Sequence, residues 1–408
     1  MSQAVPQTLT LRQWRDMGPA QQCQALEASS SRQGVLADAL SVFAPRLLHR
    51  PPGDEIWHAW LDLLILAGHG ATMPAALLRH VLLARLAVLD RLPQDAAVAW
   101  PNYAVYPAPQ PMDVELDLLN QALERKDLQG VALLGRSMAE ESEPRRLLVR
   151  RLQTQVCADN FREGQRLMFA DAVADLETAL DAGAFTAAYL TAVFLHFQSP
   201  AGAAVVVPEG RASGDPDTQT PLLVSLRARN LSAFLQRIRA LGDEPVAGMR
   251  QLLLAMALLI LERGAPDGEE CQRLARIYLR LAALLKMHHP SRRLARRAFF
   301  AAAVQVFELA GWAPDPRWPD YTALLHAYQA ADGGTIQGPL LSWQAGLHSL
   351  RSGRFEQWLL ELAEVVGARE NAPLFWPVWV QARQAMDLAA GPLAWVNALV
   401  PLRLYGDA

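Results

Sequence analysis

The stretch Ala122-Leu123-Glu124-Arg125-Lys126-Asp127-Leu128 is one of four copies of a motif that decides the fold. Each copy has a small residue and a Leu, then four mostly polar residues, then a Leu or Phe. The other copies lie at 179–185, 225–231 and 349–355, and Pro144, Pro200, Pro245 and Pro373 follow the four in turn. We interpret each copy as a helix end, a polar turn and a second helix, which the Pro stops. The sequence therefore predicts an all-α fold of antiparallel helical hairpins.

Helical periodicity dominates the rest of the chain as well. Between residues 274 and 285 the apolar residues recur with the spacing of one buried helical face. They are Leu274, Ile277, Tyr278, Leu281, Leu284 and Leu285. No series of alternating strands separated by tight turns appears, which supports the all-α prediction.

The copy at 179–188 resembles the tetratricopeptide repeat (TPR) family, since Gly183, Phe185 and Ala188 occupy its turn, entry and small packing positions. The other copies depart from that pattern, with Val131, Phe234 and Trp358 at the small position. They are also spaced irregularly, by 57, 46 and 124 residues, whereas a regular array recurs at about 34. The resemblance implies stacked hairpins in an irregular α-solenoid whose concave surface binds peptides or proteins. The alternative is an irregular helical domain whose hairpins do not stack in register.

Two stretches interrupt the helical pattern and divide the chain. Residues 93–112 are rich in Pro and aromatic residues and predict a loop held on the surface. Residues 199–221 predict a linker or a loop excursion. We therefore expect an amino-terminal helical lobe at 1–92, a helical-hairpin region at 113–198 and a second one at 222–408.

Composition limits the classes of function. The net charge of −3 argues against polyanion binding by the whole molecule. All basic residues but Lys126 and Lys286 are arginines, which is typical of a GC-rich bacterial genome. The three cysteines lack metal-binding or disulfide spacing. Residues 1–10 show no basic region before an apolar one, and no apolar run is long enough to predict a membrane span, so we expect a cytoplasmic protein.

The densest local signal is basic. Residues 271–307 contain no Asp or Glu, and their arginines are candidates for binding an acidic protein segment. They are Arg273, Arg276, Arg280, Arg292, Arg293, Arg296 and Arg297. The alternative is that they pair with carboxylates elsewhere in the fold. Nucleic acid is not the predicted partner, because no recognised binding motif accompanies the patch.

Tryptophan is concentrated near the carboxy terminus, where seven of the eleven lie beyond residue 310. If exposed, Trp343, Trp358, Trp376 and Trp379 form an aromatic surface that anchors a partner. The alternative is that they fill the core between Ala-rich helices. The chain thus offers a basic and an aromatic candidate surface.

A protein-binding adaptor, scaffold or chaperone-like accessory subunit is the leading prediction. The alternative is an α-helical metal-dependent or acid/base enzyme centred on Glu55, His58, His69 and His80. Glu55 and His58 match the E-x-x-H spacing of di-iron bundles, but the second pair that such a site needs is missing from the sequence. No phosphate-binding, dinucleotide-binding or hydrolase motif appears either, so we predict no cofactor, no metal ligand and no catalytic residue.

Overall fold

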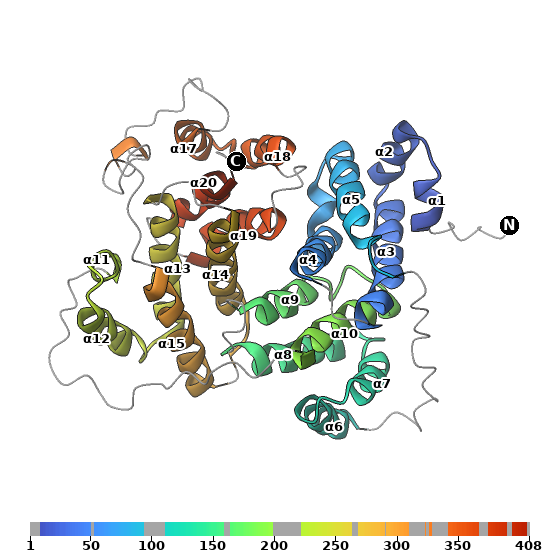
Figure 1. Ribbon diagram of the computed structural model, residues 1–408, viewed down its shortest axis with the longest axis horizontal. Coiled ribbons are helices and arrows are strands. Elements are labelled where there is room, and N and C mark those ends of the chain that lie inside the picture. The colour runs from blue at the N-terminus through green and yellow to red at the C-terminus, as the bar shows by residue number, and fades with distance from the viewer. Residues whose placement is uncertain are drawn as a thin grey trace. The chain divides into compact units, whose positions relative to one another are not determined.

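The computed structural model describes residues 9–49, 53–93, 111–158, 164–198, 222–262, 268–289, 291–309, 323, 326–328, 342–366, 374–389 and 394–405. All regular secondary structure in these ranges is helical, which confirms the all-α prediction (Figure 1). The chain divides into two compact units. Unit 1 comprises Met1–Gln153 with Phe169–Pro200, and unit 2 comprises Thr154–Met168 with Ala201–Ala408.

Unit 1 brings together the predicted amino-terminal lobe and most of the first hairpin region. Its helices are α1 (Leu11–Arg15), α2 (Pro19–Glu27), α3 (Ser29–His49), α4 (Asp54–His69), the 3-10 turn η1 (Gly70–Thr72), α5 (Ala75–Leu89), α6 (Met112–Glu124), α7 (Leu128–Met138), α8 (Ser142–Val156), α9 (Gln165–Ala174) and α10 (Ala182–Gln198). The chain passes between the units within α8 and again within α9. The predicted loop at 93–112 lies outside the described residues except at its ends.

Unit 2 holds the predicted carboxy-terminal hairpin region. Its helices are α11 (Leu222–Arg227), α12 (Leu231–Leu241), α13 (Pro245–Glu262), α14 (Gly268–Lys286), α15 (Arg292–Leu309), α17 (Trp343–Arg351), α18 (Phe355–Val366), α19 (Phe375–Ala389), the 3-10 helix η3 (Ala394–Leu399) and α20 (Val400–Tyr405). The predicted linker at 199–221 lies outside the described residues.

Three of the four predicted hairpin turns are confirmed: they join α6 to α7, α11 to α12, and α17 to α18. Each turn contains one residue with left-handed backbone, namely Lys126 (φ 56°), Arg229 (φ 48°) and Gly353 (φ 70°). The residue that follows donates its N–H to the carbonyl five positions earlier, as in a Schellman helix end. The motif therefore has one local geometry in both units.

The fourth copy differs. Helix α9 ends at Ala174, so Leu180 lies in the connection and Phe185 lies in the first turn of α10. The prediction that Pro ends the second helix is wrong where it can be checked, because Pro144 lies in the first turn of α8 and Pro245 begins α13. Pro lacks a backbone N–H and fits the first turn, where that donor has no intrahelical acceptor. Pro200 and Pro373 lie outside the described residues.

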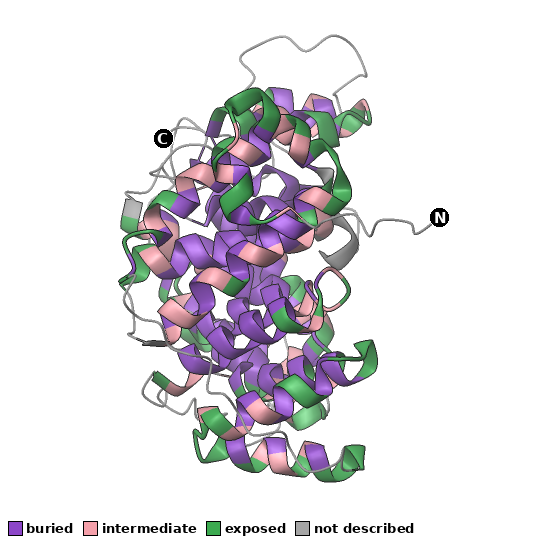
Figure 2. Cartoon of the chain, turned by 90° about the vertical axis from the view of Figure 1, so that its right-hand side faces the viewer, coloured by how far each residue is buried: buried purple, intermediate pink, exposed green. Residues whose placement is uncertain are grey.

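Helix α10 is the centre of unit 1 and packs against α3 and α7. Every residue from 184 to 195 is buried, so this helix is apolar on all sides rather than on one stripe. Its two buried threonines have hydrogen-bond partners: Thr191 Oγ1 accepts the Trp60 indole N–H over 2.8 Å, and Thr186 Oγ1 donates to the carbonyl of Ala182 over 2.7 Å. Figure 2 shows outer helices, by contrast, that are buried on one side and exposed on the other.

Two arginines fasten unit 1 in the same way. Arg32 Nε donates to the carbonyl of Leu26, and its Nη1 donates to Gly70 over 2.7 Å. Arg145 Nε likewise donates to Ala139 at the end of α7, and its Nη1 donates over 2.7 Å to Leu180 in the connection before α10. Each arginine is the fourth residue of its helix, and its Nε donates to a carbonyl at the end of the preceding helix, which has no partner within that helix.

Helix α13 runs through the core of unit 2 and contacts α14, α15 and α19. Among the described helices it is the one that is long and apolar enough to cross a membrane by length and composition. It is 67% buried inside the protein, as a core helix is, which is consistent with the prediction of no membrane span.

Candidate functional site

The predicted basic patch spans α14 and α15 in unit 2, and its α14 arginines are not a free surface. Arg280 is fully buried and donates to Gln305, so the prediction that it forms part of an accessible site is wrong. Its methylenes pack on Gly164, where φ is 89° and no side chain competes for the space. Arg273 pairs with Glu308 over 3.9 Å, and Arg276 is half-buried.

The arginines at the start of α15 are different. Arg293 and Arg297 are exposed and, within the described part of the chain, neither forms an ion pair. Arg292 reaches Asp243 in the turn between α12 and α13, at 3.7 Å. The guanidinium of Arg296 lies over the Phe300 ring, 5.6 Å from its centroid. We name Arg292, Arg293, Arg296 and Arg297 the α15 arginine cluster.

The electrostatics of the α15 arginine cluster are unfavourable without an anion. All four charges lie in the first two turns of the helix, where the dipole is already positive. Arg293 and Arg297 are also one turn apart, a spacing at which like charges cost a few tenths of a kcal/mol. Ser291 caps the helix by accepting the N–H of Leu294 over 3.2 Å, but it brings no negative charge. A carboxylate or phosphate from a partner would offset both the unfavourable interaction with the helix dipole and the repulsion between the arginines.

The predicted aromatic surface is wrong for three of its four residues. Trp358, Trp376 and Trp379 are buried in the core of unit 2, where the Trp358 ring lies against Gly346 of α17. The Trp376 and Trp379 rings meet edge to face at 5.7 Å, and the Trp379 indole N–H donates to a backbone carbonyl in α18 over 2.9 Å. Trp343 is half-buried at the start of α17.

The four residues of the predicted enzyme site differ in their exposure and in their partners. Glu55 is exposed and pairs with Arg91 over 2.8 Å, and His80 is exposed on α5. His58 is buried in α4, while His69 at the end of α4 pairs with Asp175 over 2.9 Å. No group of three or more His, Cys, Asp or Glu side chains able to hold a metal ion occurs among the described residues. The structure therefore does not assemble these four residues into a centre.

A buried ion pair in unit 1 was not predicted. Arg85 Nε of α5 lies 2.7 Å from Asp62 Oδ2 of α4, and both side chains are nearly inaccessible. Burial raises the pKa of the Asp62 carboxyl to about 6, although the charge and hydrogen bond of Arg85 act in the opposite direction. The signal in the sequence is a single Asp inside the apolar run Trp60-Leu61-Asp62-Leu63-Leu64.

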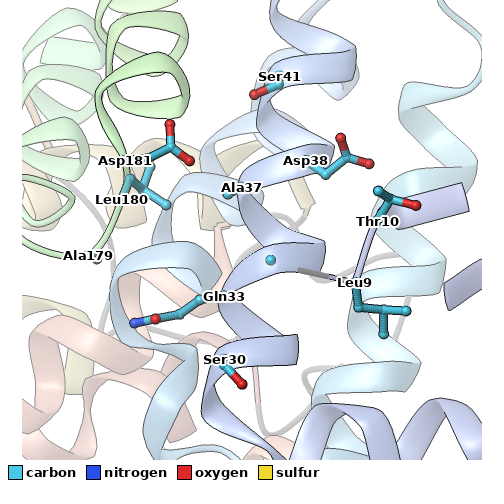
Figure 3. A pocket seen from close by; sticks show the side chains of 11 residues that line it. Leu9, Thr10, Ser30, Gln33, Ala37, Asp38, Ser41, Ala179, Leu180 and Asp181 are labelled. Atoms are coloured by element: carbon cyan, nitrogen blue, oxygen red, sulfur yellow. The ribbon is translucent and has the colours of Figure 1, made fainter. Parts of the chain in front are cut away.

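A polar groove on α3 is the second candidate site, and sequence reasoning missed it. This α3 groove has a volume of about 480 Å³ (Figure 3). Three segments line it: the entry to α1, one face of α3 and the turn before α10. Its lining residues are Leu9, Thr10, Ser30, Gln33, Gly34, Ala37, Asp38, Ser41, Ala179, Leu180 and Asp181.

Backbone donors fix the two carboxylates of the α3 groove. Asp38 Oδ2 accepts the N–H of Leu11 over 2.8 Å, and Asp181 Oδ1 accepts the N–H of Ala184 over 2.9 Å. Neither carboxylate forms an ion pair with a described residue. The helical spacing of Ser30, Asp38 and Ser41 is the only sign of this face in the sequence, because its two walls come from distant segments.

Comparison with known proteins identifies no relative of this chain. No family model, curated protein or solved structure matches the chain. The likeness of 179–188 to a tetratricopeptide repeat therefore stays a prediction. The function has to be inferred from the side chains described above.

Proposed function

We propose that this protein is a cytoplasmic adaptor, scaffold or chaperone-like accessory subunit that binds an acidic segment of another protein through the α15 arginine cluster. One observation carries the proposal: Arg293 and Arg297 are exposed, one helical turn apart, and form no ion pair with any described residue. TPR-like hairpins would serve as the framework that presents the cluster.

The spacing of these two arginines suits carboxylates on a peptide. Residues four apart on a helix have Cβ atoms about 5–6 Å apart. Alternate residues of an extended chain lie on one face at a separation of about 6–7 Å. Two acidic side chains on the same face of an extended segment can therefore each meet one guanidinium, and arginine can bind a carboxylate through two parallel hydrogen bonds.

The two other members of the cluster support this interaction without competing for it. Asp243 contacts Arg292, and the Phe300 ring contacts Arg296, so both side chains have a neighbour within unit 2 that restricts them before a partner arrives. Ordering in advance lowers the entropy cost of binding. The cluster occupies one helix end in a protein with a net charge of −3, which favours a short acidic peptide over a long nucleic acid.

The test uses a fluorescent peptide of alternating Glu and Ser residues and the full chain. We expect Arg293→Glu/Arg297→Glu to weaken binding at least about tenfold, and higher salt to weaken binding to the unmodified protein. The charge-matched control is Arg125→Glu/Arg136→Glu, which reverses two exposed arginines in unit 1. Equal binding by both variants would contradict the proposal.

A further inference from the structure

The α3 groove has the size of a small-molecule site. Its volume of about 480 Å³ falls within the range of about 300–1,000 Å³ that ligand pockets occupy. It lies wholly in unit 1 and shares no residue with the α15 arginine cluster. A ligand of the groove would therefore be separate from the acidic partner proposed above.

Negative charge stands on both sides of an apolar floor. In Figure 3 the carboxylates of Asp38 and Asp181 lie on opposite sides of Ala37. Leu180 and Gly34 extend this floor, and the polar side chains of Gln33 and Ser41 line the groove one helical turn before and after Ala37. One oxygen of each carboxylate accepts a backbone N–H, and neither carboxylate forms an ion pair with a residue that the structure describes. The groove thus carries one carboxylate on each side of Ala37.

We infer that the α3 groove binds a small aliphatic diamine or polyamine. One ammonium group would lie at Asp38 and another at Asp181, and the methylene chain would cross Ala37. Each ammonium has three N–H donors, so it can bind a carboxylate and still donate to neighbouring oxygens. The hydroxyls of Ser30 and Ser41 supply such oxygens among the lining residues.

Charge and length together set the specificity. A charge-assisted hydrogen bond is roughly twice as strong as a neutral one, so the two carboxylates supply most of the affinity. A monoamine can satisfy only one of them at a time. A diamine whose chain spans the floor satisfies both, and its methylenes cover apolar surface that water otherwise contacts.

Isothermal titration of the full chain with putrescine and spermidine tests this inference. We expect saturable binding at one site per chain, with butylamine weaker by at least about tenfold. Asp38→Asn and Asp181→Asn should each weaken putrescine binding about tenfold. Asn keeps an acceptor oxygen for the backbone N–H that each carboxylate binds. These variants should therefore remove the charge and preserve the local structure. Asp117→Asn, which removes an exposed carboxylate from α6, is the control and should bind like the unmodified chain.

Several results would overturn the inference. One is the absence of saturable amine binding. Another is a loss of putrescine affinity in Asp117→Asn as large as that in Asp38→Asn and Asp181→Asn. A third is binding of a Lys-containing peptide without binding of the free diamine. Ala37→Leu gives an independent check, because it fills the floor without changing any charge and Leu is a strong helix former. This variant should also lose putrescine binding, and circular dichroism should show unchanged helicity. Retained binding in a folded Ala37→Leu protein would contradict the placement of the methylene chain.

Discussion

Unit 1 and the first two turns of α15 use arginine in opposite ways. In unit 1, Arg32 and Arg145 are buried and donate to backbone carbonyls at helix ends and in a connection. On α15, Arg293 and Arg297 are exposed and form no ion pair with a described residue. The role of an arginine therefore depends on whether backbone carbonyls that lack other donors lie within reach of its guanidinium. A count of arginines therefore says little about function until their acceptors are known.

The largest expected effect comes from the ring on which a structural arginine rests. Phe185 is fully buried, and the Arg145 guanidinium lies 5.2 Å from its centroid. Phe185→Ala should lower the free energy of unfolding of unit 1 by about 3–5 kcal/mol, because it leaves a large cavity. Chemical denaturation followed by circular dichroism measures the loss. A loss below about 1 kcal/mol would show that this ring does not anchor the core.

Arg145 itself should matter somewhat less. Arg145→Met leaves the carbonyls of Ala139 and Leu180 without their donor, and we expect a loss of about 2–4 kcal/mol. Arg145→Lys keeps the charge but has one nitrogen, which cannot reach both carbonyls, so its stability should be intermediate. If Met and Lys variants were both as stable as the unmodified chain, the contrast between structural and exposed arginines would fail.

The buried pair of Asp62 and Arg85 predicts how stability depends on pH. The pKa of Asp62 is about 6 in the folded protein, against an ordinary value of 3.8, so the folded state binds a proton that the unfolded state releases. This contribution is fully present below about pH 4 and is lost as pH rises through 6. The unfolding free energy should therefore rise by about 1 kcal/mol from Asp62 alone between pH 7 and pH 5.

Denaturation of the unmodified chain and of Asp62→Asn at both pH values isolates this contribution. The variant has no carboxyl at position 62 and should lack the increment, while every other titrating group stays the same. If the unmodified chain gained no stability relative to Asp62→Asn on acidification, the raised pKa would be wrong. The pair would then resemble an ordinary ion pair, in which the folded state favours the ionised carboxyl.

The sequence predicted the parts of this protein that depend on neighbouring residues. Three hairpin turns follow from a polar segment between a Leu and an apolar entry residue, as at 122–128, because such a turn is a local structure. The role of Pro was misjudged at 144 and 245, since Pro is compatible with both a helix stop and a helix start. The sequence alone does not distinguish the two.

Features that depend on distant residues could not be predicted. Trp376 and Trp379 are core residues that pack on each other, with Trp379 bonded to α18, and Arg280 is buried because Gly164 leaves it room. The α3 groove needs the segments around Thr10, Asp38 and Asp181 to meet, and no local pattern states that they do. The run of arginines without nearby acids at the start of α15 was visible in the sequence, whereas the exposure of Arg293 and Arg297 was not.

The most direct test of the central claim compares binding and stability in one variant. Arg293→Glu/Arg297→Glu changes two exposed side chains, so its melting temperature should match that of the unmodified chain, since surface changes usually shift stability by under about 0.5 kcal/mol. Its affinity for the acidic peptide should nevertheless fall at least about tenfold. A folded variant that binds the peptide as tightly as the unmodified chain would contradict the claim that these arginines form the partner site.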